Sequence, residues 1–198
     1  MRPARWIPLV LVVLLLVWWF WPEPSVSHPP GILAPDDPLQ TPVSAMRIWE
    51  KNGFVISSLA RFKIDAVVLH RERYRFDRGA KISPLDLALG WGPMSDQNVI
   101  DQIDFSQSYR WYHWSSKHPP VQTGVIATHS ANMHMIPAND DVEETLFSAI
   151  RGDIVDLEGW LVEVRGENGW KWVSSLRRDD TGDGSCELVY VEKATVRE

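Results

Sequence analysis

The segment HSANMHMIPAND, residues 129–140, holds the densest group of potentially reactive side chains in this chain of 198 residues. His129 and His134 stand five positions apart, and Ser130 directly follows the first of them. Imidazole nitrogens bind zinc and copper, and a serine hydroxyl beside a base can act as a nucleophile. The segment therefore raises three alternatives: it holds a metal, it carries a nucleophile, or it only builds the fold.

A metal site at these histidines would need a further ligand from another segment. A spacing of five is neither the i, i+4 step of a helical zinc pair nor the two-residue step along one face of a strand. The alternative metal set is His113, His129 and His134, if the three converge. The prediction is that the chain holds no metal and no cofactor, and that these histidines bond to backbone groups or face water.

A hydrolytic site would use Ser130 together with a base. The order of an N-terminal apolar segment, a serine and a later Gly-Asp strand start loosely resembles that of signal-peptidase-like serine proteases. In that family the serine directly precedes a methionine, whereas two residues separate Ser130 from Met133 here. His129 is a poor base for its neighbour, because adjacent strand residues point to opposite faces. No catalytic residue is predicted, and Ser130, His129 and Lys171 form the alternative catalytic set.

Tryptophan is frequent in the chain and favours a binding surface. Seven of the eleven tryptophans lie outside the first 21 residues, which is more than one small core buries easily. Surface tryptophans favour contact with proteins or carbohydrate. A core position for most of them is the alternative. The predicted binding residues are Trp111, His113, Trp114, Asn132 and His134.

The first 21 residues predict a membrane anchor. Arg2 and Arg5 precede WIPLVLVVLLLVWWFW, residues 6–21, a run without charge. As a helix, this run would be about 24 Å long, close to a bilayer core of about 30 Å. The arginines predict a single-pass protein of the bacterial inner membrane, with a cytoplasmic N-terminus and a periplasmic C-terminal domain. The alternative is a cleaved signal peptide, with SVS at residues 25–27 as the cleavage site.

Residues 22–44 predict a proline-rich linker, and residues 45–198 predict one exported β-rich globular domain. Seven of the fourteen prolines fall between Pro22 and Pro42. Proline disfavours helices and central strands and favours extended polyproline II. We expect the linker to tether the domain to the bilayer.

Strands are the elements that would position most of the candidate residues. Alternating apolar residues from Phe62 to Phe76 predict one long strand or two consecutive strands. Ser83 followed by Pro84 predicts the start of a short helix. The residues VIAT, 125–128, predict a strand that leads into the histidine segment.

The C-terminal half shows clearer signals. Asp140 begins a helical pattern that includes Leu146, and Asn168-Gly169 predicts a tight hairpin turn. The expected fold class is α+β and β-rich. It consists of an N-terminal single transmembrane helix followed by a small barrel-like (OB-like) domain with helical insertions. A mixed open sheet is the alternative for the domain.

Five stretches together resemble a family of uncharacterised bacterial membrane-anchored proteins. They are SPLDLALGWGPMSD, RWYHW, HSANMHMIPA, GDIVDLEGWLV and SSLRRDDTGDGSCELVYVE. The resemblance covers residues 62–192, nearly the whole predicted domain. It implies a coherent single domain on a membrane anchor, and it implies no chemistry because the family has no established activity.

Charge and cysteine content narrow the classes of partner. A net charge of −6 argues against attraction to nucleic acid. The single cysteine, Cys186, excludes an intramolecular disulfide and a multi-cysteine metal site.

We expect a non-catalytic binding or scaffolding protein of the cell envelope. Its partner is expected to be an envelope or membrane protein, and the sequence leaves its oligomeric state open. The alternative is an envelope hydrolase, serine- or metal-dependent, centred on HSANMH.

Overall fold

The computed structural model describes residues 10, 12, 13, 24–177, 182 and 184–198, and they form a β-rich α+β fold. This class confirms the coarse expectation from the sequence. The short helical elements are η1 (Arg78–Lys81), η2 (Gly92–Ser95), α2 (Gln97–Ile100), α3 (Thr123–Thr128), α4 (Asp140–Ser148) and η3 (Glu167–Gly169). The strands are β1 (Leu39–Pro42), β2 (Ile48–Lys51), β3 (Phe54–Arg73), β4 (Leu85–Gly90), β5 (Asp104–Ser108), β6 (Trp111–Ser115), β7 (Ser130–Pro137), β8 (Ile154–Arg165), β9 (Lys171–Val173) and β10 (Glu187–Arg197).

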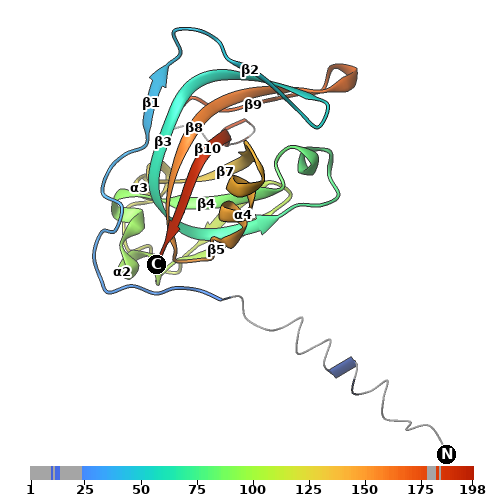
Figure 1. Ribbon diagram of the computed structural model, residues 1–198. Helices are drawn as coiled ribbons and strands as arrows, with labels where there is room; N and C mark the ends of the chain where they lie inside the picture. The colour runs from blue at the N-terminus through green and yellow to red at the C-terminus, as the bar shows by residue number, and fades with distance from the viewer. Residues whose placement is uncertain (1–9, 11, 14–23, 178–181, 183) are drawn as a thin grey trace, which may run out of the picture.

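Five strands of the main sheet pair in a closed ring. The order is β3–β4–β7–β10–β8, and β8 pairs with β3 again to close it. All neighbours in the ring are antiparallel except β7 and β10, which are parallel. In Figure 1, β3 and β8 bend along the length of the molecule and reach β2 and β9 beyond the ring. The long strand predicted from the alternating pattern is present as β3.

Apolar side chains fill the inside of the ring because the strands alternate in sequence. Residues of one parity, such as Ile64 of β3, Leu87 of β4 and Met133 of β7, point to this common core. Helix α4 packs Val142 and Leu146 against the same core. As predicted, α4 begins at Asp140; the Asn139 side chain caps it by accepting a hydrogen bond from the Val142 amide.

Two further apolar clusters lie on the outer faces of the strands. One includes Ala88, Phe105 and Ile126, where the β5–β6 hairpin covers β4. The other includes Ile136, Leu188 and Trp160, together with aromatic side chains from β2 and β9. The space between the two clusters is therefore enclosed by the hairpin on one side and by β9 on the other.

Two local predictions were wrong. Residues 85–90 form strand β4 where the sequence predicted a short helix from Ser83. All six residues of LDLALG are buried, which a strand between two packed layers allows and an exposed single helical turn does not. Residues 123–128 form helix α3 where VIAT predicted a strand; Thr128 Oγ1 donates to the Gly124 carbonyl within it.

The proline-rich segment predicted as a linker contacts the domain from Ser25 onward. His28 Nε2 lies 2.8 Å from the Gly152 carbonyl oxygen, and Ala34 is fully buried. Strand β1 then pairs with β3 at the edge of the sheet, a place that tolerates proline. The segment runs beneath α2 and up the outside of β3 (Figure 1). The folded part therefore begins before residue 45.

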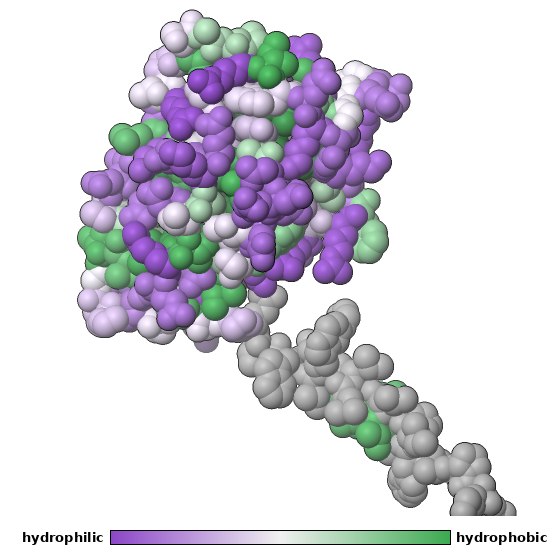
Figure 2. All heavy atoms as spheres, in the orientation of Figure 1, coloured by the Kyte–Doolittle hydropathy of each residue, from purple (hydrophilic) through white to green (hydrophobic). Residues whose placement is uncertain are grey.

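The anchor predicted at residues 6–21 lies almost wholly outside the described residues. Within the described part of the chain, none of the helices has both the length and the apolar character needed to cross a membrane. Figure 2 shows polar side chains over most of the face in view, with apolar residues in small separate groups.

Candidate functional site

Strands β4 and β7 place a row of polar side chains on the outer face of the ring. Their inward positions are apolar, so the alternate positions point outward. The register pairs Asp86 with His134, Ala88 with Asn132 and Gly90 with Ser130. Asp86, Asn132, His134 and Ser130 are all buried, because the outer clusters cover this face.

Asp86 is the centre of the buried charges. Its side chain is fully buried and accepts a 2.7 Å hydrogen bond from Arg110 Nη1 at Oδ1. His134 Nδ1 lies 2.9 Å from the other oxygen, Oδ2, at an angle that departs from an ideal hydrogen bond. Arg110 also binds Asp77 and stacks over the Tyr74 ring at 3.7 Å from its centroid. Paired in this way, the buried carboxylate avoids the large cost of an isolated buried charge.

His134 is held in a charged environment. Burial lowers the pKa of its imidazole, but the neighbouring Asp86 carboxylate and the Cys186 side chain outweigh burial and raise the pKa to about 9. The Trp172 ring packs against the imidazole, with 4.5 Å between ring centroids. His134 Nδ1 faces Asp86, and His134 and Cys186 line the same cavity. The three side chains form a Cys–His–Asp series.

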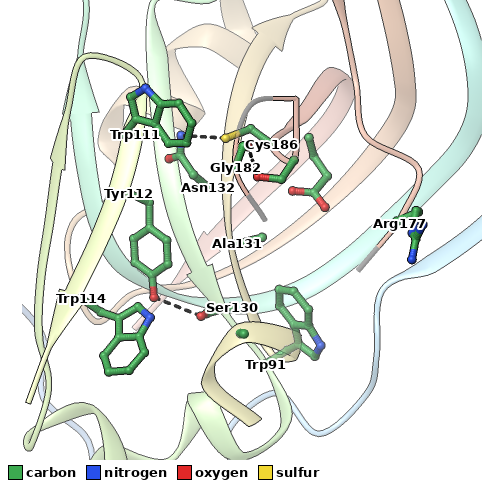
Figure 3. Close-up of a pocket in the computed structure, with 13 residues that line it drawn as sticks. Trp91, Trp111, Tyr112, Trp114, Ser130, Ala131, Asn132, Arg177, Gly182 and Cys186 are labelled. Carbon is green, nitrogen blue, oxygen red and sulfur yellow. Dashed lines mark hydrogen bonds between the residues drawn. The ribbon is translucent and has the colours of Figure 1, made fainter. Parts of the chain in front are cut away.

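A second chain of hydrogen bonds fixes Asn132 beside the same cysteine. His70 Nδ1 contacts Gln107 Oε1 at 2.9 Å, and Gln107 Nε2 donates to Asn132 Oδ1. The Asn132 amide nitrogen therefore points the other way, where it donates to the Arg110 carbonyl at 3.0 Å. It also lies 3.9 Å from Cys186 Sγ (Figure 3). The side chain of Asn132 thus presents an N–H group at the sulfur.

Cys186 lies at the boundary of two adjoining cavities. The first, of about 200 Å³, is lined by Trp111, Tyr112, Trp114, Asn132 and Cys186 among others (Figure 3). The second, of about 340 Å³, is lined by Arg110, Trp111, His134, Trp172 and Cys186 among others. Cys186 is only partly buried. The sulfur is therefore reachable from a space walled by aromatic rings.

The structure brings four of the five predicted binding residues to these cavities. Trp111, Trp114 and Asn132 line the first cavity, and Trp111 and His134 line the second. His113 is not among the residues that line either cavity; it pairs with Ser106 in the β5–β6 hairpin.

The alternative catalytic set is not brought together. Ser130 Oγ donates to the Ile126 carbonyl at 2.7 Å, so the Tyr112 hydroxyl, 3.0 Å away, is the donor to Ser130. His129 Nδ1 lies 3.0 Å from the Val125 carbonyl oxygen. Lys171 Nζ lies 2.8 Å from a Glu163 carboxylate oxygen on the neighbouring strand. Each of the three candidates therefore bonds to a partner outside the set.

The structure does not bring together the alternative metal set of His113, His129 and His134 either. Across residues 24–177, 182 and 184–198, no three histidine, cysteine or acidic side chains are grouped so that they could hold a metal ion. The imidazole of His134 contacts Asp86 and Cys186, not the other two histidines.

Sequence reasoning missed Asp86, Arg110 and Cys186. Asp86 is a single carboxylate inside the apolar run LDLALG, which is a signal for a buried functional group once that run is read as a strand. Cys186 is the single cysteine of the sequence, and the residues beside it in the chain do not indicate His134 as a neighbour. Arg110 gives little local signal, since it lies in the hairpin turn with a left-handed φ of 71°.

Comparisons of the chain with protein-family models, with curated proteins and with solved structures found no match.

Proposed function

We propose that this protein is a binding protein of the cell envelope that holds a segment of a partner protein in the two tryptophan-lined cavities. The observation that carries the proposal is the position of Trp111, which lines both cavities and is 39% exposed. Exposed tryptophans next to concave, partly polar pockets are typical of binding hot spots.

The ring order and the position of the site support this proposal. Counted along the chain, the ring strands are β3, β4, β7, β8 and β10, and α4 lies between the third and fourth of them. An OB-like barrel has this order, and OB-folds bind ligands on the outer face of their second and third strands and in the adjoining loops. The cavities lie on β7, the third of these strands, which lines the first with Asn132 and the second with His134. The second cavity also contacts the β3–β4 and β8–β9 connections through Gly79 and Trp170.

The volumes of the two cavities indicate that only a small part of the partner protein binds inside them. At about 200 and 340 Å³ they are at or below the low end of ligand pockets, which span about 300–1,000 Å³. Each therefore suits one or two inserted side chains of a partner segment better than a large cofactor. A membrane anchor at residues 6–21 with the domain in the periplasm would place the partner in the bacterial envelope, as the sequence predicts.

A serine hydrolase is the weaker alternative. The Ser130 hydroxyl already donates to a backbone carbonyl, and Lys171 is paired with Glu163. A serine nucleophile needs its proton directed to a base within hydrogen-bond reach.

Photocrosslinking in cells that express the full chain tests the proposed binding. A photoreactive amino acid at position 111 is expected to give a discrete crosslinked protein in the membrane fraction. The same group at Ile48, which is 62% exposed and lines neither cavity, is the matched control. Equal crosslinking patterns from the two positions, or none from position 111, would overturn the proposal.

A further inference from the structure

We propose that Cys186 is a nucleophilic thiol with His134 as its general base, and that it accepts the acyl group of a carboxylic ester bound in the tryptophan-lined cavities. This activity goes beyond partner binding and does not depend on it. It rests on the Cys–His–Asp series and on the access to the sulfur from two cavities.

His134 is oriented as a base must be. A carboxylate at Nδ1 fixes the ring and its tautomer and stabilises the imidazolium that forms when Nε2 takes a proton. Arg110 occupies one oxygen of Asp86, so the other oxygen is directed at His134. The Trp172 ring packs on the imidazole and restricts its rotation. Asp86 is therefore a positioning residue that acts through His134.

Asn132 supplies a donor where negative charge would develop. Its amide nitrogen lies 3.9 Å from the sulfur, and the bond from Gln107 to its oxygen fixes which end faces Cys186. An N–H group at this place can stabilise the oxyanion of a tetrahedral intermediate formed on the sulfur.

Acyl transfer is the chemistry that a single thiol can complete. Cys186 is the only cysteine of the chain, so a disulfide exchange cycle lacks the second sulfur that would resolve it within the chain. An ester requires no oxidant or reductant. The aromatic walls contributed by Trp111 and Trp172 favour an ester with an apolar or ring-shaped acyl or alcohol part.

The reaction balances with these residues. In the proposed resting site the proton of Cys186 lies on His134 Nε2, so the sulfur attacks as the thiolate and bonds to the carbonyl carbon of the ester. The C–O bond then breaks, and the leaving oxygen takes the proton from His134 and departs as the alcohol. Water attacks the resulting thioester while His134 takes its proton. The C–S bond breaks, the carboxylic acid leaves, and the proton stays on His134, which restores the thiolate and imidazolium pair.

The test is acetylation of the full chain in detergent by 4-nitrophenyl acetate, followed by intact-mass spectrometry after an acid quench. The wild-type chain is expected to gain one acetyl group on Cys186 and to release 4-nitrophenol in a burst. Cys186→Ala should gain none. His134→Gln should acetylate about 100-fold more slowly or worse, the usual range for loss of a general base. His113→Gln, which changes a histidine outside both cavities, should react as the wild type does.

The pH profile and an unfolded reference keep the test independent of variant folding. Asp86→Asn is expected to slow acetylation and to move the profile to lower pH, because His134 loses the carboxylate that holds its proton. The native wild-type thiol should react at least 10-fold faster than the same chain unfolded in urea. Equal rates in the native and unfolded chains, or an unmodified Cys186, would overturn the proposal. So would a folded His134→Gln variant that reacts at the wild-type rate.

Discussion

At the scale of single residues, the site depends on one buried carboxylate. Asp86 binds Arg110 with one oxygen and faces His134 with the other, and it is fully buried. The charged groups nearest to His134 are thus Asp86 and, beyond it, Arg110. This arrangement links the protonation of one histidine to the stability of the whole fold.

The free energy of unfolding should therefore depend on pH through His134. Its pKa rises from an ordinary value of 6.5 to about 9 in the folded chain. The stabilisation is then fully present below about pH 6.5 and is lost as pH rises through about 9. At about 1.4 kcal/mol per pKa unit, the difference between the two pKa values lowers the free energy of unfolding by roughly 3 kcal/mol over this pH range. Urea denaturation of the wild type between pH 6 and 10 measures this decrease.

His113→Gln serves as the control for that titration and should keep the wild-type dependence. His134→Gln should remove most of the slope between pH 6.5 and 9. A wild-type stability that rises over this interval would contradict the assigned role of His134.

At the scale of elements, the site requires that long strands close the ring in one register. β8 and β10 approach closely at Gly159, where an added Cβ would lie 2.0 Å from the Tyr190 carbonyl oxygen. The pairing of β10 with both β8 and β7 places Cys186, which directly precedes β10, beside His134. The close approach at Gly159 therefore helps to determine where the sulfur lies.

Gly159→Ala should force β8 and β10 apart and lower the free energy of unfolding by about 1–3 kcal/mol, the usual cost of overpacking. Gly124→Ala is the matched control. No heavy atom lies within 4 Å of the added Cβ in helix α3, so this change should stabilise the chain by up to about 1 kcal/mol. Chemical denaturation of both variants checks the pair, and equal effects would contradict the close-approach explanation.

At the scale of the whole molecule, the segment before β1 is part of the fold. The Ser95 hydroxyl accepts from the amides of Leu33 and Ala34 at 3.2 and 3.0 Å and donates to the Gly92 carbonyl. His28 and Gly31 bond to Gln97 and Asp96 nearby. The proline-rich segment therefore rests on the η2–α2 region and is not a free tether over this part of its length.

Ser95→Ala should release this segment while leaving the ring intact. The two amides lose their acceptor, which should cost about 1–3 kcal/mol in the free energy of unfolding. Amide hydrogen exchange of residues 25–42 is expected to accelerate more than that of β3 or β8. Ser106→Ala, at an exposed position of β5, should change neither quantity. Uniform acceleration over all strands would argue instead for global destabilisation.

The sequence by itself determined the features that depend on neighbouring residues. Apolar alternation predicted the strand from Phe62, Asp140 marked the start of α4, and Asn168-Gly169 predicted the β8–β9 turn. The aromatic content of the sequence also indicated Trp111 and Trp114 as binding residues. These signals are local, because side-chain periodicity, capping and turn geometry act within a few residues.

Only the tertiary structure decided the site. Asp86 meets His134 because β4 and β7 pair in one register, and Cys186 joins them because β10 lies parallel to β7. The sequence misread β4 as a helix, so the partner of His134 was not found. Register between distant strands follows from which faces are buried against each other, and that depends on the packing of the whole ring.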